Sequence, residues 1–226
     1  MRTIFFDGWG FGCKGLSTLS SFFPGSFVIS SDCEIDYTML NYEEIHLAGW
    51  SVGGLRALKL YFMYPEKIRK ITLISSTSNF IAGVRGREAA LNLLKKRYSN
   101  PETRIKSCED FYSSLLNEEA KFTTKPHIFP TMEDFLSTSS TLNSIKQIES
   151  LELLEERISA HELEKIKADV LVIHGLNDNL IPASHCNFIL NHIPNATLIE
   201  IPDCGHLLPF TSLSLLNESI RNFLMS

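Results

Sequence analysis

The stretch Gly49–Gly54, of sequence GWSVGG, follows the apolar run Ile45–Ala48 and precedes a helical pattern. This order predicts a strand, a sharp turn and a helix, with Ser51 at the apex of the turn. Such a turn strains the backbone of the serine and lifts its hydroxyl clear of the sheet. A side chain at Gly49 or Gly53 would collide with the neighbouring strand or helix. The context therefore favours a nucleophile elbow over a chance match to G-x-S-x-G.

Strands and helices are expected to alternate at both ends of the chain, which is typical of a parallel sheet covered on both faces. The expected strands are residues 3–6, 27–29, 44–48, 70–74, 170–173 and 196–201, with helices at 16–23, 52–64 and 213–224. Residues 31–43 are polar and ambiguous. The sequence predicts the fold class α/β, with a core of mostly parallel sheet and helices on both faces formed by residues 1–78 and 161–226. Residues 79–160, where helical periodicity dominates, are expected to form a helical lid insertion over the carboxyl edge of the sheet.

Charge and cysteine usage exclude several other classes. A net charge of -5 over 226 residues does not indicate a nucleic-acid partner. No apolar run is long enough for a signal peptide or a membrane span, so we expect no membrane association. The five cysteines are scattered, without a C-x-x-C pair or metal-ligand spacing. We therefore expect reduced thiols in a cytoplasmic protein and no metal site.

A serine hydroxyl needs a base to become nucleophilic, and the base needs an acid to orient it. In folds with such an elbow the chain order is serine, acid, histidine. Asp178 follows the strand at 170–173 and His206 follows the strand at 196–201. Ser51, Asp178 and His206 are therefore predicted to form a catalytic triad at one edge of the sheet.

Other roles are open for the two later residues. Asp178 could be a turn or helix-capping residue before Pro182, and His206 a turn histidine with one backbone hydrogen bond. Asp203 competes for the role of the acid because it lies close to His206. Its short spacing from the histidine favours a turn residue instead.

Two backbone N–H groups are candidates for an oxyanion hole. The N–H of Val52 lies at the start of the helix after the elbow. The second donor in such folds comes from the loop after the first strand, here Asp7–Gly10, where the N–H of Trp9 is the candidate. The alternative is a plain glycine-rich turn with a buried tryptophan.

Together, the elbow, the segment from Gly175 to Pro182 and the pair Gly205-His206 resemble an α/β-hydrolase. The closest likeness is to the pimeloyl-acyl-carrier-protein methyl ester carboxylesterases of biotin synthesis, which have a G-W-S-x-G elbow and an H-G-W-G loop. In this chain Asp7 stands where the histidine of that loop is usual, a change that would alter the electrostatics near the oxyanion. The resemblance covers both ends of the chain, and the lid only in its helical character.

This resemblance implies a serine carboxylesterase that hydrolyses the methyl ester of a pimeloyl chain carried by acyl carrier protein. By the same resemblance, Ser51 attacks the ester, His206 takes its proton and Asp178 fixes the imidazole, while Trp9 and Val52 hold the oxyanion. No metal or organic cofactor is implied, and we expect a monomer that meets a small-molecule ester and its carrier protein.

A basic run in the lid is a candidate docking surface for an acidic carrier, because opposite potentials steer encounter. Seven basic residues lie between positions 85 and 106, against two glutamates. The candidate partner-binding residues are Arg85, Arg87, Lys95, Lys96 and Arg97. The alternative is an ordinary solvated helix face.

Three other functions compete with this interpretation. Another small serine hydrolase, such as a small-acyl esterase, an acyl-thioesterase or a carbon–carbon bond hydrolase, would have the same triad. A catalytically silent binding module is disfavoured because every triad member is present. A basic-lid interaction protein with incidental esterase activity is the third. The acyl chain length and the carrier stay open, and so do the pocket residues, for which the candidates are Trp50, Phe80, Phe111 and Phe129.

Overall fold

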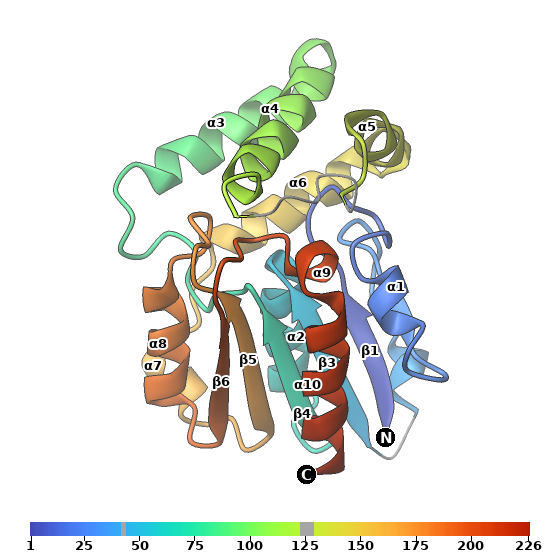
Figure 1. Cartoon of the computed structure of the whole chain (residues 1–226), viewed down its shortest axis with the longest axis vertical. Coiled ribbons are helices and arrows are strands. Elements are labelled where there is room, and N and C mark those ends of the chain that lie inside the picture. The colour runs from blue at the N-terminus through green and yellow to red at the C-terminus, as the bar shows by residue number, and fades with distance from the viewer. Residues whose placement is uncertain (42–43, 123–128) are drawn as a thin grey trace.

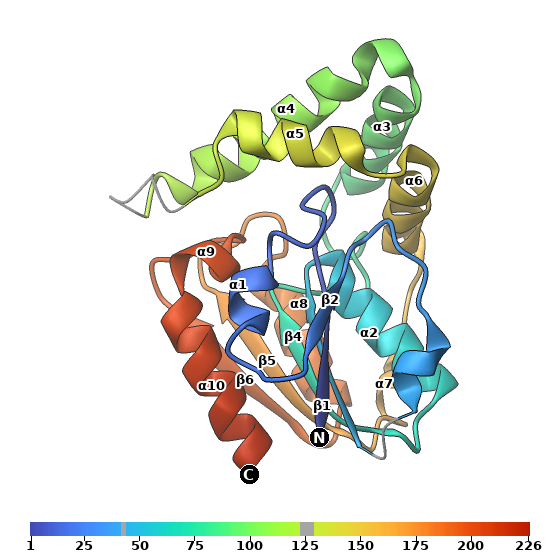
Figure 2. The same cartoon turned by 90° about the vertical axis from the view of Figure 1, so that its right-hand side faces the viewer.

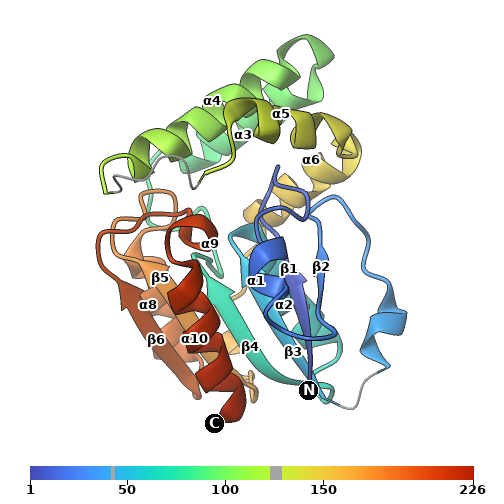
Figure 3. The same cartoon turned by 45° about the vertical axis from the view of Figure 1, so that its right-hand side comes forward.

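The computed structural model describes residues 1–41, 44–122 and 129–226. Six strands form one parallel sheet in the order β2-β1-β3-β4-β5-β6. Figure 1 shows β1 and β3 to β6 in this order, and Figure 3 also labels β2 at the edge. The predicted α/β fold class is confirmed. The strands are β1 (Arg2–Phe6), β2 (Phe27–Ile29), β3 (Ile45–Trp50), β4 (Ile68–Ile74), β5 (Asp169–Gly175) and β6 (Ala196–Ile201).

Helices cover both faces of this sheet, so the strands at its centre are buried on both faces. All six residues of β3 are buried. Helices α1 and α10 lie on one face, and α2, α7 and α8 lie on the other (Figures 1 and 2). The helices of the core are α1 (Ser17–Ser20), α2 (Val52–Met63), α7 (Ala160–Leu163), α8 (Ala183–His192), α9 (Leu208–Thr211) and α10 (Leu213–Met225).

Between β4 and β5 the described chain is helical and contributes no strand. Four helices here lie above the edge at which the strands end (Figures 1 and 3). We call them the lid helices, and the division into a core and a lid at residues 79 and 160 stays our proposal. They are α3 (Arg87–Ser99), α4 (Pro101–Glu119), α5 (Met132–Thr141) and α6 (Ser144–Glu152), followed by the 3₁₀ turn Leu153–Glu155.

The helix expected at residues 16–23 is shorter in the structure, where α1 spans only Ser17–Ser20. Tight turns follow it, with Phe22 N bonded to Leu19 O and Phe23 N bonded to Ser20 O. In the ambiguous stretch 31–43, a 3₁₀ helix spans Tyr37–Leu40, and residues 42–43 lie outside the described part. Among the described helices, none has the length and apolar character needed to cross a bilayer.

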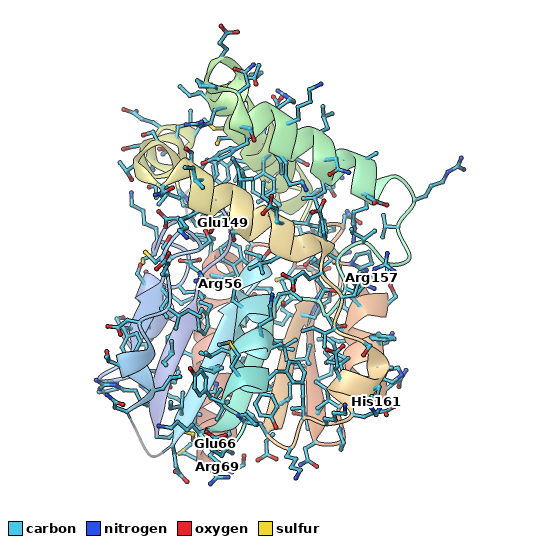
Figure 4. All side chains as sticks on the ribbon, turned by 180° about the vertical axis from the view of Figure 1, so that it is seen from behind. Arg56, Glu66, Arg69, Glu149, Arg157 and His161 are labelled. Carbon is cyan, nitrogen blue, oxygen red and sulfur yellow. The ribbon has the colours of Figure 1, made fainter. Side chains whose placement is uncertain are left out.

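Arg56 ties the segment after β2 to helix α2. Its side chain is buried, and its Nη1 and Nη2 donate to the carbonyls of Ser30 and Cys33, both at 2.6 Å. Figure 4 labels Arg56 and Glu149 on the back of the molecule, where α2 of the core meets α6 of the lid. Arg56 therefore helps to hold the part of the core on which α6 rests.

Candidate active site

Ser51 occupies the sharp turn between β3 and α2, with φ 56° and ψ -125°. Its N–H donates to Ile74 O at 3.0 Å, and its carbonyl accepts from Ser76 Oγ at 2.7 Å. A non-glycine residue rarely adopts this backbone conformation, and strain of this kind persists only where the surroundings impose it. The hydrogen bonds to the end of β4 are the contacts that hold it.

The glycines on either side of Ser51 leave room for backbone alone. A Cβ on Gly49 would lie 2.3 Å from Gly53 O, and a Cβ on Gly53 would lie 2.1 Å from Phe6 O. Both distances are far below van der Waals contact, and the neighbouring atoms belong to backbone that cannot move aside. The elbow therefore depends on glycine at both positions.

We expect Gly53→Ala to lower the free energy of unfolding by about 3 kcal/mol, because the new methyl group overpacks against β1. Gly83→Ala is the matched control, since its Cβ would meet nothing within 4 Å. With φ +72° it carries only the left-handed penalty of about 1 kcal/mol. Urea denaturation of both variants measures the difference, and equal losses would contradict a steric role for Gly53.

Ser51, His206 and Asp178 form a chain of hydrogen bonds. The hydroxyl of Ser51 lies 3.0 Å from His206 Nε2, and His206 Nδ1 lies 2.8 Å from Asp178 Oδ2. Asp178 Oδ1 accepts a further bond from Ile181 N at 2.8 Å, which fixes the carboxylate. Asp178 and His206 are each 5% exposed. This is the arrangement in which histidine can take the serine proton while the carboxylate holds the imidazole.

Asp203, the competing acid, is exposed and lies in a left-handed turn with φ 54°. The hydrogen bond from His206 goes to Asp178 instead. Trp50 steadies the histidine from another side, because its indole N–H donates to His206 O at 3.0 Å. We therefore attribute the presence of Trp50 beside the nucleophile to this contact with His206 and not to a place in the wall of a pocket.

Trp9 and Val52, the expected oxyanion donors, both line the cavity that contains Ser51. Within the described ranges, neither backbone N–H has a protein acceptor. The Trp9 side chain is anchored elsewhere, because its indole N–H donates to Gln147 O at 3.0 Å. The two N–H groups are thus available to a substrate oxygen near the serine.

Asp7, which departs from the family pattern, is fully buried behind this loop. Its Oδ1 accepts from Gly8 N at 2.7 Å and its Oδ2 from Leu16 N at 3.0 Å. Burial raises the pKa of Asp7 from 3.8 to about 7, against the opposing effect of these backbone hydrogen bonds. The carboxyl group therefore braces the loop of Trp9 from beneath.

This raised pKa predicts a pH dependence of stability. Between about pH 4 and pH 7 the unfolded chain has lost the Asp7 proton while the folded protein keeps it, so stability falls as pH rises and levels off above about 7. We expect the difference in unfolding free energy between wild type and Asp7→Asn to change by up to about 1.4 kcal/mol per pH unit in this window. Denaturation of both proteins from pH 4 to pH 8 measures it, and parallel curves would contradict a buried, titrating Asp7.

The cavity beside Ser51 has a volume of about 380 Å³ and a mainly apolar wall. Of the aromatic residues expected to line a pocket, Phe80 and Phe111 do so. Trp50 and Phe129 are buried and do not form its wall. An apolar cavity that opens onto the serine suits an acyl or alkyl chain.

Three of the five candidate docking residues are engaged within the lid. Arg87 is only 8% exposed, donates from Nη1 to Phe80 O at 2.9 Å and lies over the Phe80 ring. The other two are ion-paired: Lys95 with Glu155, and Arg97 with Asp110 at 2.7 Å. Charge counted along the sequence therefore overstates the charge available to a partner.

Arg85 and Lys96 differ from these three. Both are exposed, and within the described ranges neither has an ion-pair partner. Arg85 also lines the cavity beside Ser51. These two residues are the candidates for contact with an acidic partner.

Two buried lid residues near the site gave no signal in the sequence. Gln147 of α6 accepts from Gly10 N at 3.2 Å and donates to Ser31 Oγ at 2.9 Å, so it holds the loop of Trp9. Glu119 of α4 accepts from the backbone beside His206. Neither residue lies in a motif, and each is brought to the site only by the folded lid.

The model of the α/β hydrolase fold family matches residues 37–213. The chain therefore belongs to the α/β hydrolase fold family. The enzyme class expected from the sequence is a serine hydrolase that acts on carboxylic esters. Membership of this family and the comparisons below are consistent with that class.

The similar proteins of known sequence have different names. A putative carbamate hydrolase RutD of Caulobacter sp. (strain K31) is 26% identical over 82% of this chain and 67% of its own length. A pimeloyl-[acyl-carrier protein] methyl ester esterase of Nitrosomonas europaea is 27% identical over 74% of this chain and 65% of its own length. A second esterase of that name, from Aromatoleum aromaticum, is 24% identical over 92% of each chain.

The solved structures extend the likeness of fold to the whole chain. An esterase from Exiguobacterium antarcticum superimposes with a TM-score of 0.79 at 18% sequence identity, over 100% of this chain and 92% of that one. At this identity the likeness concerns the fold alone.

Proposed function

We propose that this protein is a carboxylesterase that hydrolyses the methyl ester of a pimeloyl chain attached to acyl carrier protein. The observation that carries the proposal is the apolar cavity of about 380 Å³, which reaches Ser51 beside the N–H groups of Trp9 and Val52, neither of which has an acceptor in the described part of the chain. Two relatives named as such esterases support the choice of ester.

The chemistry begins when Ser51 Oγ attacks the ester carbonyl carbon and His206 Nε2 takes the serine proton. Asp178 keeps the imidazole in the tautomer whose Nε2 is free to accept. Negative charge gathers on the carbonyl oxygen, where the N–H groups of Trp9 and Val52 donate to it.

Collapse of the tetrahedral intermediate breaks the bond to the methoxy oxygen. His206 returns the proton to that oxygen, and methanol leaves an acyl group on Ser51. A water molecule then gives its proton to His206 and attacks the acyl carbon. The second collapse releases the free carboxylic acid and restores the Ser51 hydroxyl.

The exposed bases Arg85 and Lys96 support a carrier-bound substrate, because acyl carrier protein is strongly acidic. We expect Arg85→Glu with Lys96→Glu to lower kcat/KM for the carrier-bound ester about tenfold, through slower association. Because Arg85 also lines the cavity, the single variant Lys96→Glu serves for the comparison with a small ester, and its cleavage of a p-nitrophenyl ester should be unchanged. The control is Lys165→Glu with Lys167→Glu, two exposed residues just before β5, at the opposite edge of the sheet.

The assignment is tested with purified protein and pimeloyl-acyl-carrier-protein methyl ester, by mass spectrometry of the carrier. We expect loss of the methyl group with wild type and none with Ser51→Ala. A carbamate and a carbon–carbon bond substrate are run in parallel, because a relative of similar identity is named a putative carbamate hydrolase. Failure to cleave the methyl ester, together with failure to restore growth to a biotin auxotroph that lacks its own esterase, would overturn the assignment.

A further inference from the structure

Glu119, the last residue of α4, contacts the loop that carries His206. Its side chain is buried, with 1% of the residue exposed. One carboxylate oxygen accepts from Gly205 N at 3.2 Å and the other from Leu207 N at 2.5 Å. The two N–H groups on either side of His206 in the chain are thus both bonded to one lid side chain.

The position of Glu119 is unfavourable for a carboxylate in two ways. Burial disfavours the charged form and raises the pKa of Glu119, against the effect of its backbone hydrogen bonds. The C-terminus of a helix carries partial negative charge, which also opposes a carboxylate there. A glutamate that only ended a helix would be better placed in water, so this one is held in place by its contacts with the histidine loop.

The fit around Glu119 is tight. A Cβ on Gly205 would lie 2.8 Å from Glu119 Oε1, so a larger residue at position 205 would push the carboxylate from its present place. The charged groups that face Glu119 are His206, whose positive form stabilises its charge, and Asp178, which opposes it. The carboxylate is therefore close enough to respond to the charge on the imidazole.

The same end of α4 also contacts the loop of the acid. Glu118 accepts from Asn179 Nδ2 at 2.5 Å, and Asn179 directly follows Asp178. Figures 2 and 3 show this end of α4 above α9 and the loops at the carboxyl edge of the sheet. One helix terminus of the lid thus binds the loops of both the acid and the base.

We propose that Glu119 is a positioning residue, which clamps the His206 loop from the lid and uses its negative charge to favour the imidazolium formed when His206 takes the Ser51 proton. The inference rests on the role of His206 in the proposed function. According to this inference, His206 can act as a base only while α4 is in contact with its loop. The lid then contributes to the chemistry as well as to the cavity wall. The inference also explains why glycine precedes His206, because Gly205 leaves room for the Glu119 carboxylate that holds the histidine loop.

The test compares Glu119→Gln with wild type on a p-nitrophenyl ester, after titration of active sites with a fluorophosphonate. An amide oxygen can accept from one N–H, but the amide NH₂ opposes the other. We expect kcat per labelled site to fall about 10-fold to 100-fold with little change in KM. The acid limb of the pH–rate profile should move to lower pH, because the imidazolium loses a stabilising charge. Glu119→Asp, which keeps the charge, should recover the acid limb better than the amide does.

Glu102→Gln is the matched control, because Glu102 is exposed in the first turn of the same helix. It should leave both kcat and the acid limb unchanged. Glu119→Gln could lower only the melting temperature or the yield and leave kcat per labelled site and the acid limb as in wild type. In that case the residue is structural and the inference is wrong. If wild type itself takes no label, the proposed function fails first, and the clamp fails with it. Should Glu119→Gln not fold, Glu119→Asp decides. Its retained charge should keep the acid limb of wild type, while the shorter side chain, which cannot reach the N–H groups of both Gly205 and Leu207, should lower kcat per labelled site. A kcat per labelled site equal to that of wild type would overturn the clamp.

Discussion

Replacement of Ser51 by alanine is expected to lower kcat for ester hydrolysis by a factor on the order of 10⁵ to 10⁶, the scale found when a triad nucleophile is removed from other serine hydrolases. The reason is that the Ser51 hydroxyl is the group held 3.0 Å from His206 Nε2 at the wall of the apolar cavity. Without it no acyl-enzyme can form. Initial rates with a p-nitrophenyl ester, at matched protein concentration, measure the loss.

Ser51→Ala should fold as wild type does, because the hydrogen bonds that hold the turn use backbone atoms of residue 51. We expect its unfolding free energy to stay within about 1 kcal/mol of wild type. Ser214→Ala, an exposed position on α10, controls for the substitution itself and should keep full activity. Residual activity in Ser51→Ala above about one hundredth of wild type would show that another group attacks the ester.

Asp178→Asn is expected to lower kcat by about 10⁴, as loss of the orienting carboxylate does in other triads. The carboxylate accepts from His206 Nδ1 at 2.8 Å, and an amide NH₂ in its place favours the tautomer with its proton on Nε2. That tautomer cannot take the proton of Ser51. The measurement is kcat over a range of pH, together with the rate of fluorophosphonate labelling.

The matched control is Asp203→Asn, which changes the other aspartate near His206 in the sequence. Asp203 is exposed and turns the chain with a left-handed residue, and asparagine also tolerates that conformation. We expect its activity to stay within about twofold of wild type. Equal losses in the two variants would mean that the acid has been assigned wrongly.

The residues brought together by the strand ends could be predicted because their signals are local. A glycine-flanked serine between a strand and a helix defines an elbow, and each later strand end delivers one polar residue to the same edge of the sheet. These signals predict Ser51, Asp178 and His206 as a triad, and the structure joins the three side chains by hydrogen bonds. The parallel sheet brings residues that are far apart in the sequence to one edge, so short motifs were sufficient to predict that these residues meet.

The lid could not be predicted to the same depth, because its contacts depend on how helices pack. Arg87 and Arg97 look like surface charge in the sequence, yet one is buried against Phe80 and the other is paired with Asp110. Glu119 is 87 positions from His206 in the chain and carries no motif. Only the fold places such a residue beside the catalytic loop.

Mass spectrometry of the protein after reaction with a fluorophosphonate tests the central claim most directly. The Ser51 oxygen should displace fluoride from phosphorus and leave one phosphonyl group per chain, located on the peptide that contains Ser51. His206→Ala should react far more slowly, since nothing then takes the serine proton. An unlabelled wild-type protein, or an adduct on any other peptide, would contradict the account.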